Sequence, residues 1–120
     1  MNPQQNALVV MICGRLDALT GPDHEKKLKQ VVENGAHRLV LDMTTLDYIS
    51  SAGLRVLLTV LKAIQENRGQ LVLAGVGPNV ASVLTMSGLD SILQRTATVA
   101  EALASIGQNG DSISAAETSR

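Results

Sequence analysis

The chain has 120 residues, the usual size of one domain, with 45% hydrophobic residues and a formal net charge of −1. The near-neutral charge and the absence of Phe and Trp argue against nucleic-acid binding, which uses surplus basic charge and stacking aromatic rings. No apolar run is long enough to span a bilayer, and residues 1–5 lack the features of a signal peptide. We therefore expect a cytoplasmic protein without direct membrane insertion and without disulfides.

The first predicted strand covers residues 7–13, a short run rich in Val and Ile. The run is continuous and not alternating, which is typical of a strand covered on both faces, so Cys13 is expected to be a quiet core thiol. Thr20 then predicts a helix start, because its hydroxyl can cap the helix and Pro22 suits the first turn. Gly35 is expected to end this helix.

The second predicted strand covers residues 38–43 and is followed by a connection over residues 44–50. Leucine and other apolar residues then recur at helical spacing, which predicts a long helix over residues 51–66. A third strand is predicted over residues 70–76.

The last part of the chain repeats the pattern. Gly77 and Pro78 predict the start of another helix, and Gly88 is expected to end it in the left-handed conformation. A short fourth strand is predicted at residues 92–95 and a final helix at residues 99–106.

This alternation predicts an α/β fold: a single-layer, mostly parallel or mixed sheet of four to five strands packed with about four helices. Residues 1–106 are expected to form the domain. Residues 107–120 are polar and are expected to form a disordered tail.

Two adjacent serines, Ser50 and Ser51, stand where the long helix is predicted to begin. A serine there can cap the helix by accepting a hydrogen bond from a free backbone N–H. It can also present a hydroxyl for phosphoryl transfer, because the first helical turn tolerates the negative charge of a phosphate. The small residues Ala52 and Gly53 leave room for another protein's active site. Both interpretations remain open from the residues alone.

Three segments, in this order, resemble the sulfate transporter and anti-sigma factor antagonist (STAS) family. Residues 14–20 (Gly-Arg-Leu-Asp-Ala-Leu-Thr) are similar to its Gly-x-Leu-Asp-x-x-Thr element, and residues 46–54 (Leu-Asp-Tyr-Ile-Ser-Ser-Ala-Gly-Leu) resemble its signature. Residues 73–89 are similar to its closing elements. The resemblance covers residues 7–106 and implies a STAS-like fold.

The resemblance implies partner switching. In this cycle the unphosphorylated antagonist binds an anti-sigma factor that is also a serine kinase with a GHKL-type ATPase fold. Phosphorylation releases the antagonist, and a metal-dependent serine phosphatase resets it. The family's phosphorylated serine matches Ser51. Many members have Asp before that serine where this chain has Ser50, so Ser50 is the alternative phosphorylation site. Because some members serve transporters, an accessory subunit of a membrane transport complex is the alternative function.

The predicted partner-binding surface follows one face of the long helix. Ser51, Arg55, Thr59 and Lys62 are spaced by four, four and three residues, so they share a face; this spacing also suits an ordinary solvated surface. The resemblance favours partner binding and adds Asp17, Thr20, Ser50 and Gly53 to the surface. Asp17 is expected either near the phosphorylated serine or as a support of its own turn.

An enzyme is not expected. The Gly-x-Ser-x-Gly motif of serine hydrolases and the Gly-rich Lys-Ser/Thr loop that binds nucleotides are both absent. His24 and His37 stand alone, without a Cys or carboxylate cluster at metal-binding spacing. We therefore expect no catalytic residues, no metal and no cofactor.

Overall fold

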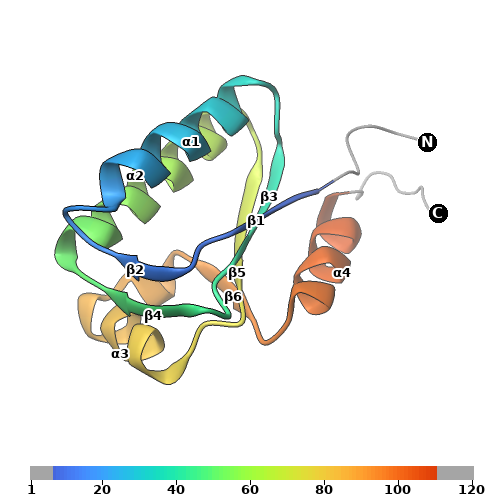
Figure 1. Cartoon of the computed structure of the whole chain (residues 1–120). Helices are drawn as coiled ribbons and strands as arrows, with labels where there is room; N and C mark the ends of the chain where they lie inside the picture. The colour runs from blue at the N-terminus through green and yellow to red at the C-terminus, as the bar shows by residue number, and fades with distance from the viewer. Residues whose placement is uncertain (1–6, 111–120) are drawn as a thin grey trace.

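The computed structural model describes residues 7–110, with side chains as far as residue 106, and these residues form six strands and four helices (Figure 1). The strands are β1 (Leu8–Met11), β2 (Gly14–Leu16), β3 (Arg38–Asp42), β4 (Leu46–Ile49), β5 (Gln70–Ala74) and β6 (Gln94–Thr96). The helices are α1 (Gly21–Glu33), α2 (Ser51–Glu66), α3 (Pro78–Ser87) and α4 (Val99–Gly110), with a 3₁₀ turn η2 (Leu89–Ser91) after α3.

The strands form two parallel sheets. The larger sheet has the order β1-β3-β5-β6, and the smaller one pairs β2 with β4. All the pairings within residues 7–110 are parallel, as expected for strands joined by helical crossovers. The predicted α/β class with a mostly parallel sheet is confirmed.

Helices cover the larger sheet on both faces. On one face, α1, α2 and α3 pack over a core that includes the fully buried Leu41 and Leu57. On the other face, Ala102 and Ile106 of α4 pack on Val40 of β3. Figure 1 shows α1 and α2 side by side, with α4 across the sheet from them. Because α2 is buried only along its inner side, its outer side is left for other contacts.

The bounds of several elements match the prediction. Helix α2 covers Ser51–Glu66 as expected, α1 ends at Glu33, two residues before Gly35, and α3 ends at Ser87 with Gly88 as its C-cap. Gly35 and Gly88 have φ values of 103° and 81°, a left-handed conformation that favours glycine. These ends could be read from the sequence because glycine marks them locally.

The prediction for the first strand is wrong in part. Strand β1 ends at Met11, and Val9, Met11 and Cys13 are exposed instead of buried. The reason is that β1 is the edge strand, while α4 packs over β3, β5 and β6. Cys13 is therefore a surface thiol and not a core residue.

The predicted connection at residues 44–50 is also wrong, because it contains strand β4. Its partner β2 lies in a segment where no separate strand was predicted, so the described residues hold six strands and not four to five. At the C-terminal end, α4 continues through residues 107–110, four residues into the predicted tail. The rest of that tail, residues 111–120, lies outside the described residues. Within residues 7–110, no helix has the length and apolar character needed to cross a membrane.

Candidate functional site

The small β2–β4 sheet brings two predicted site segments together. The turn after β2 carries Asp17 and Thr20, and α2 begins directly after β4 with Ser51. The N–H of Ser50 donates to the carbonyl oxygen of Leu16 at 3.0 Å, which fixes the end of β2 beside the start of α2. Residues far apart in the sequence therefore meet at one end of the molecule.

Ser50 and Ser51 have different environments. Ser50 is the N-cap of α2, and its hydroxyl oxygen accepts a hydrogen bond from the N–H of Gly53 at 3.2 Å. Ser51 is the first residue of the helix and is exposed. Among the described residues, the Ser51 hydroxyl has no hydrogen-bond partner. The two roles that the sequence left open are thus divided between the two serines: Ser50 caps, and the hydroxyl of Ser51 is accessible.

Gly53 corrects one expectation. It was placed on the partner-binding surface, but it is buried. A Cβ atom at this position would overlap the carbonyl oxygen of Leu16 and approach Ile49. Glycine is needed here so that α2 can lie close to the end of β2, and Gly53 therefore positions Ser51 without offering a side chain to a partner.

Asp17 organises the turn that leads from β2 into α1. Its carboxylate accepts hydrogen bonds from the N–H groups of Leu19 at 3.0 Å and Thr20 at 3.1 Å, and pairs with Nε of Arg15 at 3.1 Å. Its side chain is 16% exposed. Of the two expectations for Asp17, these contacts support the second, in which the carboxylate stabilises its own turn.

These contacts also change the acidity of Asp17. The hydrogen bond from the N–H of Thr20 and then the bond from Arg15 hold the pKa of the Asp17 carboxyl below its ordinary value of 3.8, because both favour the charged form. Asp17 is therefore a carboxylate at neutral pH, and the turn is held by a charged group.

Thr20 precedes α1 but, contrary to the prediction, does not cap that helix with its side chain. Its hydroxyl oxygen instead accepts from the N–H of Asp17 at 3.0 Å and donates to the carbonyl oxygen of Arg15 at 2.8 Å. Thr20 and Asp17 thus close the turn together.

Three exposed residues of this region were missed by the sequence analysis. Arg15 on β2 lies over the ring of Tyr48 on β4, with its Cζ atom 4.3 Å from the ring centroid, a cation–π contact between paired strands. Leu19, at the tip of the Asp17 turn, is 89% exposed. Arg15 and Tyr48 could have been linked only by predicting the β2–β4 pairing. A large apolar residue inside a predicted turn was the available signal for Leu19.

The predicted stripe on α2 lies on the outer side of the helix. Ser51, Arg55 and Lys62 are exposed and Thr59 is partly buried, whereas residues such as Val56 face inward. At a rise of about 1.5 Å per residue, the stripe extends for about 17 Å from Ser51 to Lys62. Arg55 has no acidic partner among the described residues, so its charge is available one turn from Ser51.

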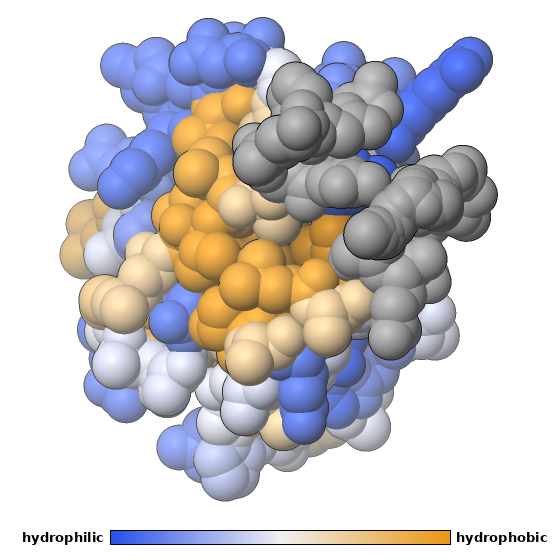
Figure 2. Space-filling model, turned by 90° about the vertical axis from the view of Figure 1, so that its right-hand side faces the viewer, coloured by the Kyte–Doolittle hydropathy of each residue, from blue (hydrophilic) through white to orange (hydrophobic). Residues whose placement is uncertain are grey.

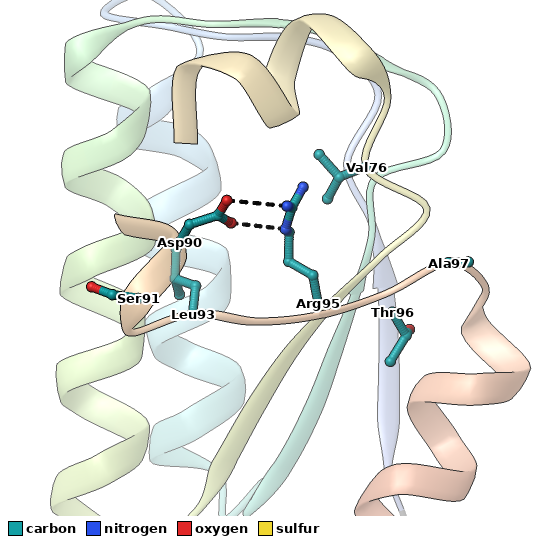
Figure 3. Close-up of a pocket in the computed structure, with 7 residues that line it drawn as sticks. All are labelled: Val76, Asp90, Ser91, Leu93, Arg95, Thr96 and Ala97. Carbon is teal, nitrogen blue, oxygen red and sulfur yellow. Dashed lines mark hydrogen bonds and ion pairs between the residues drawn. The ribbon is translucent and has the colours of Figure 1, made fainter. Parts of the chain in front are cut away.

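A shallow pocket of about 720 Å³ lies elsewhere, near the ends of β5 and β6. Figure 3 shows Asp90 and Arg95 pointing toward each other across it; their ion pair measures 2.9 Å, and Thr85 also donates to Asp90. The charges in the pocket are thus already paired. None of the predicted site residues lines it. Residues 7–110 also contain no group of His, Cys, Asp and Glu side chains placed to hold a metal ion.

Comparison with known proteins gives the family. The STAS domain model matches residues 1–102. BtrV of Bordetella bronchiseptica, named as a proposed anti-sigma factor antagonist, is 39% identical over 92 residues, which are 77% of this chain and 79% of that protein.

Solved structures agree with this assignment. An anti-sigma factor antagonist from Mycobacterium paratuberculosis is 25% identical, with a TM-score of 0.76 over 83% of this chain and 85% of that one. The phosphorylated form of the Bacillus cell fate determinant SpoIIAA has the same fold, with 19% identity and a TM-score of 0.66 over 88% of this chain and 96% of that one. The chain therefore belongs to the STAS domain family and is similar to its anti-sigma factor antagonists.

Proposed function

We propose that this protein is an anti-sigma factor antagonist that works by partner switching. In its unphosphorylated form it binds an anti-sigma factor that is also a serine kinase. The kinase transfers a phosphoryl group to the Ser51 hydroxyl, and the phosphorylated protein is released. A metal-dependent serine phosphatase then restores the binding form. The protein acts by regulated binding in the cytoplasm and has no catalytic activity of its own.

The observation that carries this proposal is the exposed, unpartnered hydroxyl of Ser51 at the first position of α2. A kinase can reach this oxygen without disturbing any hydrogen bond of the fold. The neighbouring hydroxyl of Ser50 is less accessible and already serves as the cap. Ser51 is therefore the preferred phosphorylation site, and Ser50 is the secondary one.

The location of Ser51 explains how a phosphate would change binding without unfolding the domain. A phosphoserine adds about −1.5 to −2 charges at pH 7, and the free N–H groups of a first helical turn stabilise such charge. The effect is then felt by the partner, where repulsion and desolvation of the phosphate oppose docking. A penalty of about 4 kcal/mol corresponds to roughly a thousandfold loss of affinity.

The surface around Ser51 supplies features that protein interfaces use. Leu19 is almost fully exposed on a turn held rigid by Asp17, and Tyr48 presents part of its ring on β4. Exposed aromatic and apolar side chains on a rigid support are typical anchors of an interface. Arg55 and Lys62 add positive charge along α2. We infer that the partner surface extends from the Asp17 turn across Ser51 and along α2, and that it complements this surface with apolar and acidic groups.

Two comparisons support the proposal. BtrV carries the name of an antagonist of this kind, and SpoIIAA has been solved in a phosphorylated form.

Locating the phosphate tests the proposal. The purified chain is incubated with its cognate anti-sigma factor and ATP, and the phosphorylated residue is identified by mass spectrometry. We expect one phosphate on Ser51, loss of most of the phosphorylation in Ser51→Ala, and continued phosphorylation in Ser50→Ala. Phosphate on neither serine, or undiminished phosphorylation of Ser51→Ala, would contradict the proposal.

A further inference from the structure

Strand β1 presents an exposed apolar edge to the outside of the larger sheet. Within residues 7–110 it pairs with β3 alone, so in this part of the chain its other edge has no strand partner. Val9 and Met11 are 40% and 55% exposed, and none of the four residues of β1 carries a charge. Figure 2 shows a continuous hydrophobic area on the side of the molecule that carries α4. Such an edge is unusual, because proteins commonly protect edge strands with charged side chains, proline or a covering element.

The register shows which face of β1 is exposed. Val9 is paired with Val40 of β3, and Val40 belongs to the cluster beneath α4. Paired residues of parallel strands point to the same side, so Val9 and Met11 face the α4 side of the sheet. Helix α4 packs over β3, β5 and β6 and leaves these two side chains uncovered. We call Val9 and Met11 the β1 patch.

The backbone of β1 is also directed outward at these two residues. The N–H of Ile12 donates to Asp42 at 3.0 Å, toward β3. Because backbone groups of successive residues in a strand point to opposite sides, those of Val9 and Met11 point away from β3 and toward the open edge. The same two residues thus offer apolar side chains and hydrogen-bonding groups.

The remaining segments of this chain are poor candidates to cover the patch. Residues 1–6 and 111–120 contain only Met1 and Ile113 as large apolar residues. Residues 1–6 also include Pro3, which has no N–H to donate to a strand pairing. Strand β1 has no charged residue, so it can pair with an identical strand without like charges meeting. A second copy of this chain therefore suits the β1 patch better.

We propose that two copies of this protein associate through antiparallel pairing of their β1 strands. With the two-fold axis at Val10, Val9 of each copy lies opposite Met11 of the other. In this register the Val9 and Met11 side chains of both copies lie on the α4 side of their sheets. The outward-facing N–H and C=O groups of Val9 in each copy can then form hydrogen bonds with those of Met11 in the other. Because β1 has no charged side chain, no like charges face each other across the axis. Ser51 lies on a different element and remains free, so the association goes beyond the proposed switch.

The size of the contact sets the expected affinity. A four-residue strand is about 13 Å long, so the pairing buries much less than the roughly 1,600 Å² of a standard stable interface. We therefore expect a weak, reversible dimer with a dissociation constant of about 100 μM.

Sedimentation equilibrium of the whole chain tests the association, from about 10 μM to about 1 mM. We expect the mean mass to rise toward that of a dimer, and Met11→Lys to weaken the dimer at least about tenfold through like-charge repulsion across the axis. Met86→Lys is the matched control, because Met86 is 84% exposed on α3 and far from β1 in sequence. Val9→Lys gives a second variant if Met11→Lys does not fold. A monomer at every concentration, or a dimer unaffected by both β1 variants, would overturn the proposal.

Cross-linking tests the register. In a Cys13→Ser background, Val9→Cys and Met11→Cys chains are oxidised separately and as a mixture. Directly opposite residues in a hydrogen-bonded pair have Cα atoms about 5.5 Å apart, within disulfide range, whereas two Val9 positions are diagonal and farther apart. We expect rapid disulfide formation in the mixture only. Equal rates in all three samples would contradict the proposed pairing.

Discussion

Ser50 and Ser51 are neighbours in the sequence with separate physical tasks. Ser50 caps α2 through its hydrogen bond with Gly53, whereas the hydroxyl of Ser51 makes no such bond among the described residues. We expect Ser50→Ala to lower the free energy of unfolding by about 1 kcal/mol, and Ser51→Ala to change it by less than about 0.5 kcal/mol. Urea unfolding of the two variants measures this difference. A larger loss in Ser51→Ala than in Ser50→Ala would contradict the assignment of the cap.

Asp17 gives the turn after β2 a dependence on pH. Its pKa is lowered in the folded protein by the hydrogen bonds from Thr20 and Arg15, so its charged form stabilises the fold. This contribution is present above the unfolded pKa near 3.8 and is lost as the pH falls through the lower folded value. We expect Asp17→Asn to melt below the wild-type protein at neutral pH and the gap to shrink as the pH falls below 3.8.

Thermal melts of both proteins across the acid range measure this gap. Asp47→Asn is the control for the loss of one charge, because Asp47 is exposed on the neighbouring strand β4. A gap between wild type and Asp17→Asn that stays constant from neutral pH to strong acid would show that the charge of Asp17 does not hold the turn.

At the scale of a single element, α2 carries both the modified residue and a cation that can respond to it. Arg55 lies four residues after Ser51, a spacing that places the two side chains on neighbouring turns of the same face. A phosphate on Ser51 would therefore meet the free N–H groups of the first turn and the guanidinium of Arg55 together. Each of these interactions is worth about 0.3–1 kcal/mol on an exposed surface.

We accordingly expect phosphorylation to stabilise the isolated domain slightly. A chain made with phosphoserine at position 51 should melt above the unmodified chain, and Arg55→Gln should remove part of that gain. Lys62→Gln removes the same charge about 17 Å from Ser51 and should leave the gain intact. If phosphorylation lowers the melting temperature, or if Arg55→Gln and Lys62→Gln act alike, Arg55 does not receive the phosphate.

At the scale of the whole molecule, local signals predicted most of the fold. The α/β class, the extent of α2 and the glycine ends of α1 and α3 depend on nearby residues, and all were confirmed. Strands β2 and β4 were missed because they lie in segments that were interpreted as connections, and their register shifts between Gly14 and Arg15. They are held by their pairing with each other and by core side chains such as Leu16 and Ile49, and these long-range contacts have no local signature in the sequence.

The candidate site was predicted in the same uneven way. Ser51 and the outward side of α2 follow from helical spacing and from the family resemblance, and the structure places both at the surface. The burial of Gly53 and the exposure of Cys13 and Met11 depend on how distant elements pack. The contact between Arg15 and Tyr48 likewise required the β2–β4 pair. The surface that faces a partner is thus built by tertiary contacts around a residue that the sequence could identify.

The central claim is that a phosphate on Ser51 prevents binding while the fold is kept. Isothermal titration of the cognate anti-sigma factor with the unmodified chain, and with a chain carrying phosphoserine at position 51, measures this directly. Circular dichroism of both chains verifies that they are equally folded. We expect the phosphate to weaken binding by about a thousandfold. Equal affinities of the two folded chains would contradict the account.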